Sequence, residues 1–185
     1  GLIAYWLSIW KPKSKLLLLD AKDAFSKQRL FENGWAQLYP GMIEWVPLSK
    51  DGKVVRVDAK ALSVETEFGQ IHKASVLNVI PPQKAGVIAE RAGVITNSGW
   101  VPVKPQTFES TLVPDIYVIG DATIANPMPK SGFAANVQAK VVAAAIVNAL
   151  AGKDVDKAKF ANTCYSLVGP EYGISIAGVY EVVDG

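Results

Sequence analysis

The segment TLVPDIYVIGD, residues 111–121, ends an apolar run in a Gly-Asp pair, and SGFAANVQAKVVAAAIVNAL follows at residues 131–150. The first stretch predicts a buried β-strand over 116–119, because four apolar residues stand together before a turn-forming glycine. The second predicts a long helix over 133–150 that Ser131-Gly132 opens and Gly152 closes. A strand that carries an acidic side chain towards the start of a helix is typical of a nucleotide-binding α/β unit.

Charged residues are scarce around these two segments. Residues 110–150 hold four charged side chains, about half of what the chain's average of 19% would give. We therefore expect this region to lie in the protein interior. The helix is expected to be a core helix rather than a membrane span, because polar residues interrupt its apolar run at Asn136, Gln138, Lys140 and Asn148.

The composition of the 185 residues excludes several classes of protein. Half of the residues are hydrophobic, which predicts a packed interior rather than disorder. The 19 basic and 17 acidic residues leave a net charge of +2, too small for a typical nucleic-acid binder. With one cysteine and one histidine, the chain offers neither an internal disulfide nor the usual ligands of a zinc centre.

The N-terminal half predicts further α/β units. Residues 1–10 are apolar at helical spacing, which indicates a buried helix, and a chain that starts inside a helix is expected to be a fragment of a longer protein. Residues 16–19 predict a buried parallel strand. Asp20, which follows it, either accepts a hydrogen bond from a ribose hydroxyl or caps the next turn. Residues 51–69 predict antiparallel hairpin strands, and residues 74–80 a further apolar strand. We expect an incomplete α/β fold of the nucleotide-binding type with inserted antiparallel β-hairpins.

The quoted segments also carry a family resemblance. Residues 111–121 resemble the second flavin signature of the pyridine nucleotide–disulfide oxidoreductase superfamily. The runs over 79–86, 124–133, 162–167 and 170–176 resemble the flavoprotein subunit of flavocytochrome c sulfide dehydrogenase, and the likeness extends from about Lys11 to Tyr180. It implies a two-dinucleotide-binding flavoprotein in three parts. Residues 1–82 match part of the second, NAD-like domain, 83–152 the returning half of the FAD-binding domain, and 153–185 the start of the C-terminal domain.

The resemblance implies a function and a cellular location. Members of this family bind FAD, oxidise sulfide to sulfur or polysulfide, and pass electrons to a c-type cytochrome subunit in the bacterial periplasm. A pair of cysteines beside the flavin carries the sulfur chemistry. Cys164 corresponds to the second cysteine of that pair, and the first would lie upstream of Gly1, so we expect this chain alone to be inactive.

The same resemblance assigns cofactor contacts. Gly120 lets the backbone approach the cofactor, and Asp121 accepts a hydrogen bond from a ribityl hydroxyl, with a buried strand that ends in an N-capping Asp as the alternative. The helix that begins at Ser131-Gly132 points its N-terminus at the flavin. Lys130 would lie near the flavin carbonyls, with a solvated loop lysine as the alternative. Pro82 would lie beside the isoalloxazine, with a plain strand-ending turn as the alternative.

The sequence is also compatible with two other functions. One is a relative of sulfide:quinone oxidoreductase, which shares the Gly-Asp strand and the helix start but passes its electrons to membrane quinone. The other is a docking module that keeps the fold without the chemistry, since the chain has a single cysteine and no Gly-x-Gly-x-x-Gly motif. A fragment lacking half of its FAD domain would also expose apolar surface and self-associate.

Overall fold

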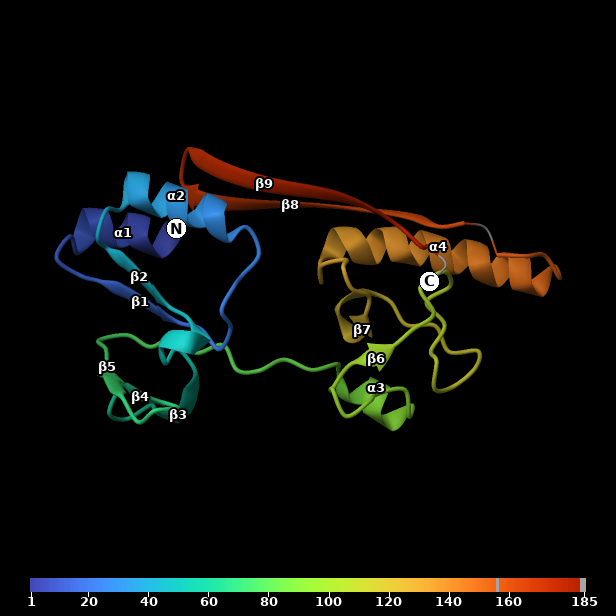
Figure 1. Cartoon of the computed structure of the whole chain (residues 1–185), viewed down its shortest axis with the longest axis horizontal. Helices are drawn as coiled ribbons and strands as arrows, with labels where there is room; N and C mark the ends of the chain where they lie inside the picture. The colour runs from blue at the N-terminus through green and yellow to red at the C-terminus, as the bar shows by residue number, and fades with distance from the viewer. Residues whose placement is uncertain (156, 184–185) are drawn as a thin grey trace. The chain divides into compact units, whose positions relative to one another are not determined.

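A computed structural model describes residues 1–155 and 157–183 of the chain, which divides into two compact units (Figure 1). Unit 1 comprises Gly1–Ile80 together with Tyr165–Ser175. Unit 2 comprises Pro81–Cys164 together with Ile176–Gly185.

Unit 1 is built on a parallel pair of strands. Strand β1 pairs with β2 so that Leu16 faces Ile43 and Leu19 faces Val46. Both helices of the unit lie on the same side of this pair in Figure 1. The four elements are α1 (Leu2–Trp10), β1 (Leu16–Leu19), α2 (Gln28–Leu38) and β2 (Ile43–Val46). Parallel strands joined through a helix form the α/β unit that the sequence predicts.

The core of unit 1 joins these elements to the end of a later hairpin. Ala4, Tyr39, Val168 and Ile174 are its buried members. The Tyr39 hydroxyl donates a hydrogen bond of 2.9 Å to the Val168 carbonyl, which ties the end of α2 to that hairpin. Helix α1 is otherwise largely exposed, with Ala4 its one buried residue, so the expected burial of this helix is wrong.

An antiparallel three-stranded sheet completes unit 1. Its strands are ordered β3-β4-β5 and follow a short 3-10 helix. Val57 pairs with Val64, and Val64 with His72. The bounds are η1 (Leu48–Lys50), β3 (Val54–Asp58), β4 (Ser63–Thr66) and β5 (Ile71–Lys73). This sheet confirms the inserted antiparallel hairpins.

Unit 2 contains the longest helix and a second, short parallel pair. Strand β6 pairs with β7, with Val101 facing Thr123. A small core of Ala85, Ala89, Val94 and Val101 includes the first residue of β6. The elements are α3 (Val87–Arg91), β6 (Val101–Pro102), the 3-10 helix η2 (Gly120–Ala122), β7 (Thr123–Ile124) and α4 (Gly132–Leu150).

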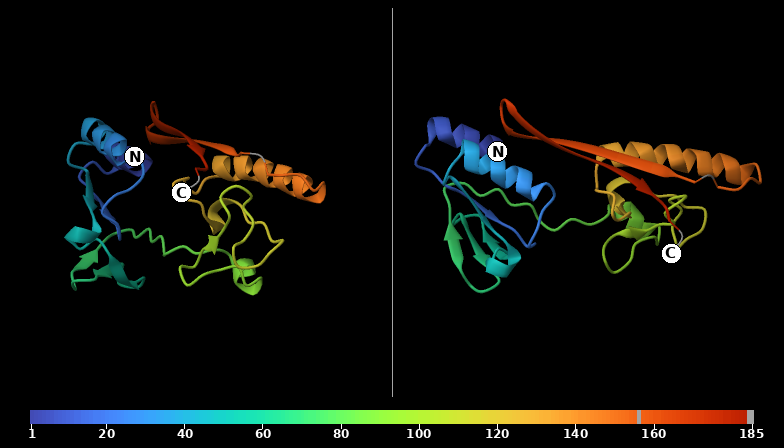
Figure 2. Two further views of the ribbon diagram at one scale, coloured as in Figure 1. Left: turned by 45° about the vertical axis from the view of Figure 1, so that its right-hand side comes forward. Right: turned by 45° about the horizontal axis from the view of Figure 1, so that its top comes forward.

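A long hairpin ends the chain, formed by β8 (Lys159–Gly169) and β9 (Tyr172–Glu181). Its tip belongs to unit 1, and its two ends belong to unit 2. In Figure 2 the part of β8 that belongs to unit 2 lies beside α4. Across the open end of the hairpin, Lys159 pairs with Glu181 at 3.1 Å.

Two predicted strands do not form. Over 116–119 only Tyr117 makes a β-bridge, to Glu109, because the backbone pairs locally with the loop at 108–110 instead of with a neighbouring long strand. Over 74–80 the chain makes no strand, and Val76 and Ile80 are 81% and 79% exposed. An extended segment becomes a strand only when a neighbour pairs with it, and no described strand pairs with residues 74–80.

Helix α4 forms as predicted, but its expected burial is wrong. Three of its 19 residues are buried: Ala134, Gln138 and Ala145. By length and composition alone α4 could cross a membrane, a property that core helices of soluble proteins share. The observed set of helices, parallel pairs and inserted antiparallel strands is that of an incomplete α/β nucleotide-binding fold.

Candidate functional site

The Gly120-Asp121 pair lies in a tight turn against α4. Gly120 has a φ of +72°, a left-handed conformation that favours glycine. Its backbone N–H donates to Gln138 Oε1 at 2.7 Å, and a Cβ at Gly120 would lie 3.3 Å from the Cβ of Ala135. Because Gln138 and Ala135 both belong to α4, the turn packs closely against this helix, and Asp121 is left exposed.

Lys130 holds the other side of the same turn. Its Nζ donates to the carbonyls of Asp121 at 2.6 Å and Thr123 at 2.8 Å, and lies 3.8 Å from the centroid of the Trp100 ring. Burial lowers the pKa of Lys130 below its usual value of 10.5, and the nearby Asp121 carboxylate opposes this shift. Through these two hydrogen bonds the ammonium holds the backbone carbonyls next to the Gly-Asp pair in place.

Ser131 caps the N-terminus of α4. Its Oγ accepts a hydrogen bond of 3.1 Å from the backbone N–H of Ala134, the usual geometry of a serine N-cap. Gly132 begins the helix and is exposed, with open space where a Cβ would stand. The first N–H groups of a helix carry a partial positive charge and donate to ligands, so this end of α4 can accept an electron-rich group.

Cys164 joins the same hydrogen-bonded cluster through Asn162. The Ser131 hydroxyl donates to Asn162 Oδ1 at 2.5 Å, and Asn162 Nδ2 donates to Cys164 Sγ at 3.2 Å. Cys164 is half-buried and carries a free thiol. We call the connected residues Asp121, Lys130, Ser131, Asn162 and Cys164 the site cluster. It brings together four of the residues that the sequence predicts for the cofactor and the chemistry.

Of the other predicted contacts, Gly120 and Gly132 adjoin Asp121 and Ser131 in the sequence, whereas Pro82 lies outside the site cluster. It is exposed, and the adjacent Gln83 side chain donates to the Pro81 carbonyl at 2.8 Å. A little further on, the Ala85 N–H donates to the Gly99 carbonyl at 2.8 Å, next to Trp100. The 81–85 segment is thus tied to the loop that carries Trp100.

Sequence reasoning missed three residues of this site: Trp100, Gln138 and Asn162. The sequence does contain a signal for Gln138, because a single glutamine within an apolar helix indicates a buried side chain that makes a hydrogen bond. Asn162 stands two positions before Cys164, so both side chains lie on one face of a strand. Nothing in the sequence around Trp100 points to Lys130, because their contact depends on the fold of the loops.

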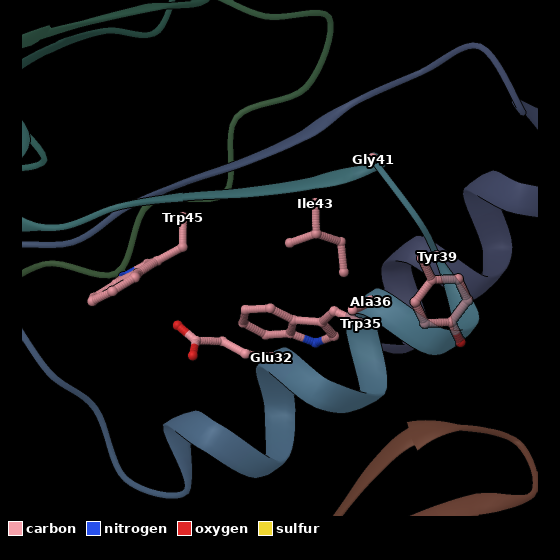
Figure 3. A pocket seen from close by; sticks show the side chains of 7 residues that line it. All are labelled: Glu32, Trp35, Ala36, Tyr39, Gly41, Ile43 and Trp45. Carbon is pink, nitrogen blue, oxygen red and sulfur yellow. The ribbon is translucent and has the colours of Figure 1, made fainter.

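Unit 1 has a cavity of its own, about 320 Å³ in volume. It lies between α2 and β2, and Figure 3 shows its aromatic lining. The indole nitrogens of Trp35 and Trp45 are buried and have no hydrogen-bond partner among the described residues. The lining residues are Glu32, Trp35, Ala36, Tyr39, Gly41, Ile43 and Trp45. None of them belongs to the site cluster.

The donors and acceptors around the site cluster fit a flavin cofactor. Asp121 offers an exposed carboxylate that can accept from a sugar hydroxyl. The open space at Gly132 leaves the helix N-terminus accessible to an electron-rich ring edge. A thiol in the same cluster can exchange with sulfur compounds.

Two family models match the chain. The model of the sulfide dehydrogenase (flavocytochrome c) flavoprotein chain, central region, matches residues 1–81. The model of flavocytochrome c sulphide dehydrogenase, flavin-binding, matches residues 156–185. Together the two models cover more than half of the chain and describe the same protein family.

Solved structures share the fold at low identity. A chain of the mitochondrial ATP synthase of Tetrahymena thermophila matches with a TM-score of 0.71 and 18% identity, over 97% of this chain and 45% of that one. The sulfide:quinone oxidoreductase of Aquifex aeolicus matches with a TM-score of 0.63 and 18% identity, over 96% of this chain and 49% of that one. The chain thus spans about half the length of these structures.

Proposed function

The chain belongs to the family of flavocytochrome c sulfide dehydrogenase flavoprotein chains, and we propose that it forms part of an FAD-dependent enzyme that oxidises sulfide to sulfur or polysulfide. The observation that carries the proposal is the site cluster. Hydrogen bonds through Asn162 link the helix N-terminus at Ser131 to the Cys164 thiol, and the adjacent Lys130 binds the backbone carbonyl of Asp121, whose carboxylate is exposed. These are the groups that a flavin and a sulfur substrate require.

In this proposal the turn at Gly120 and the start of α4 hold the cofactor. Asp121 accepts a hydrogen bond from a hydroxyl of the ribityl chain, and the N–H groups of the first turn of α4, which begins at Gly132, donate to the electron-rich edge of the flavin. Lys130 mainly stabilises the loop around the Gly-Asp pair, because its ammonium donates to two backbone carbonyls and lies against the Trp100 ring. Its charge still favours an anionic group nearby.

Cys164 supplies the sulfur chemistry, as one member of a cysteine pair. Hydrosulfide attacks the disulfide of that pair, so that one cysteine becomes a persulfide and the other leaves as a thiolate. The second cysteine is not among the residues of this chain, which contains Cys164 alone. FAD, when bound, supplies an acceptor for two electrons that can pass them on singly.

We further propose that the electrons go to a c-type cytochrome subunit and that the protein works in the periplasm. The family description supports the cytochrome, since flavocytochrome c unites a flavoprotein with a haem protein. Transfer to a quinone, as the name of the Aquifex protein implies for that enzyme, is the competing outcome.

The test uses the full chain as its gene encodes it, purified and incubated with FAD. We expect retained flavin absorbance that sulfide bleaches without oxygen, and faster recovery of the colour with cytochrome c than with a soluble quinone. Asp121→Ala should weaken FAD binding, whereas Asp115→Ala, also exposed and close in sequence, should not. A protein that retains no FAD, or retains it without any response to sulfide, would contradict the proposal.

A further inference from the structure

Asn162 is a buried polar residue that joins the helix start to the cysteine. It is 2% exposed, and both ends of its amide are used. Its Oδ1 accepts from the Ser131 hydroxyl at 2.5 Å, and its Nδ2 donates to Cys164 Sγ at 3.2 Å. A buried amide is costly unless such partners are present, so its contacts fix its position.

The geometry of β8 sets the distance between the amide and the thiol. Side chains two positions apart lie on the same face of a strand, which puts Asn162 and Cys164 side by side. Phe160 occupies the next place on that face and packs edge-on against Phe108, with 5.5 Å between ring centroids. Because Phe160 is buried in this contact, the amide and the thiol are held by the same packed face.

Ser131 fixes which end of the amide faces the sulfur. One lone pair of its Oγ accepts from the Ala134 N–H, and its hydroxyl hydrogen is donated to Asn162 Oδ1. This bond keeps the carbonyl end of the amide towards α4. The N–H end therefore points at Cys164, where it can donate to a thiol or a thiolate sulfur.

We propose that Asn162 is a positioning residue that holds the Cys164 sulfur and stabilises it as a thiolate. Hydrogen bonds to ionised acceptors are stronger than those to neutral ones, and the thiolate is the reactive form in disulfide exchange. The importance of this for sulfide oxidation rests on the proposed function. The effect on thiol reactivity does not, because it follows from the hydrogen bonds alone.

Alkylation of Cys164 by iodoacetamide tests this role in the full chain after disulfides are reduced and the reductant is removed, with mass spectrometry of the peptide that carries Cys164 as the readout. The thiolate sulfur forms a bond to carbon and displaces iodide, so the rate at neutral pH reports the thiolate that is present. Asn162→Asp keeps an acceptor for Ser131 but loses the N–H donor and adds a negative charge. Asn162→Leu removes the donor at similar size. Each should react about tenfold more slowly, the effect of losing one hydrogen bond to a charged group.

Controls separate positioning from a general loosening of the structure. Thr163→Val alters the neighbouring position on the opposite face of β8 and should leave the rate unchanged. Ser131→Ala, which releases the amide, should slow the reaction, and Ser131→Thr, which keeps a hydroxyl, should restore it. Helix content by circular dichroism identifies variants in which α4 remains folded. Loosening would instead expose Cys164 and speed its alkylation.

The outcomes distinguish this inference from the proposed function. If the Asn162 variants react as fast as the parent chain or faster, the positioning role is wrong even if sulfide is oxidised. If they react more slowly, the positioning role is supported, whether or not the full chain binds FAD and responds to sulfide.

Discussion

Replacing Lys130 by methionine removes two hydrogen bonds to the Gly120–Thr123 turn and the contact of the ammonium with Trp100, while keeping most of the side chain. The ammonium makes two hydrogen bonds to carbonyls, 2.6 Å and 2.8 Å long, and lies 3.8 Å from the Trp100 ring centroid. The residue is exposed, so each hydrogen bond is taken at about 1 kcal/mol, the ordinary net value rather than the larger one for buried charges. The contact with Trp100 adds about 0.5–1 kcal/mol at such a site.

Methionine returns part of this stabilisation, since its sulfur also packs on aromatic rings for about 0.5 kcal/mol. The expected loss in the free energy of unfolding is therefore about 2 kcal/mol. Urea denaturation measures it, with circular dichroism as the probe, because α4, the longest described helix, lies in unit 2.

Lys140→Met is the matched control, because it removes the same charge from an exposed position on α4. It should change the free energy of unfolding by less than about 0.5 kcal/mol, as surface substitutions usually do. Equal stability of the two variants would refute the assignment of Lys130 as the clamp of this turn.

Three further substitutions test other parts of the structure. Gly52→Ala should lower the free energy of unfolding by about 3 kcal/mol or more, because its Cβ would lie 2.0 Å from the Val46 carbonyl oxygen and 2.6 Å from that of Asp20. The comparison is thermal unfolding of Gly173→Ala, where the nearest contact is an ordinary 4.0 Å. Equal melting temperatures of the two variants would contradict the packing. Tyr39→Phe should lower the free energy of unfolding, measured by urea denaturation, by about 1–2 kcal/mol, since the Val168 carbonyl loses its buried hydrogen-bond donor. An unchanged urea midpoint would mean that this hydrogen bond does not stabilise unit 1. Glu109→Gln tests a pH effect. The hydrogen bond from Lys104 and that from the Asp115 N–H hold the pKa of Glu109 below its usual 4.5. The stabilisation of the folded state by ionised Glu109 is therefore fully present above pH 4.5 and is lost as the pH falls through the lowered pKa. The stability gap between parent and variant should close in acid, and a gap that persists or widens would contradict this.

Local signals in the sequence predict helix α4 and its start correctly. Ser131 is a strong N-cap residue, and Gly152, with a φ of +65°, follows the helix end. Strands β3 and β4 likewise form within residues 51–69, where the sequence predicts antiparallel hairpin strands. Features of this kind depend on neighbours within a few residues, so they can be read without the fold.

Pairing and burial could not be predicted in the same way. Residues 116–119 have the composition of a buried strand, but whether they pair depends on which segment lies beside them. The site cluster shows the same limit: Asp121, Lys130 and Cys164 were each predicted, but Asn162 was not, because its partner Ser131 is 31 residues away. Long-range hydrogen bonds connect the predicted residues into one site.

An anaerobic sulfide titration of the FAD-loaded full chain tests most directly whether Asp121 and Cys164 serve the same flavin. We predict that sulfide bleaches the flavin in the parent chain, and that Cys164→Ser keeps the bound colour but no longer responds. Asp121→Ala should lose much of the bound flavin itself. Equal bleaching of the parent chain and Cys164→Ser, or full flavin retention by Asp121→Ala, would contradict the account.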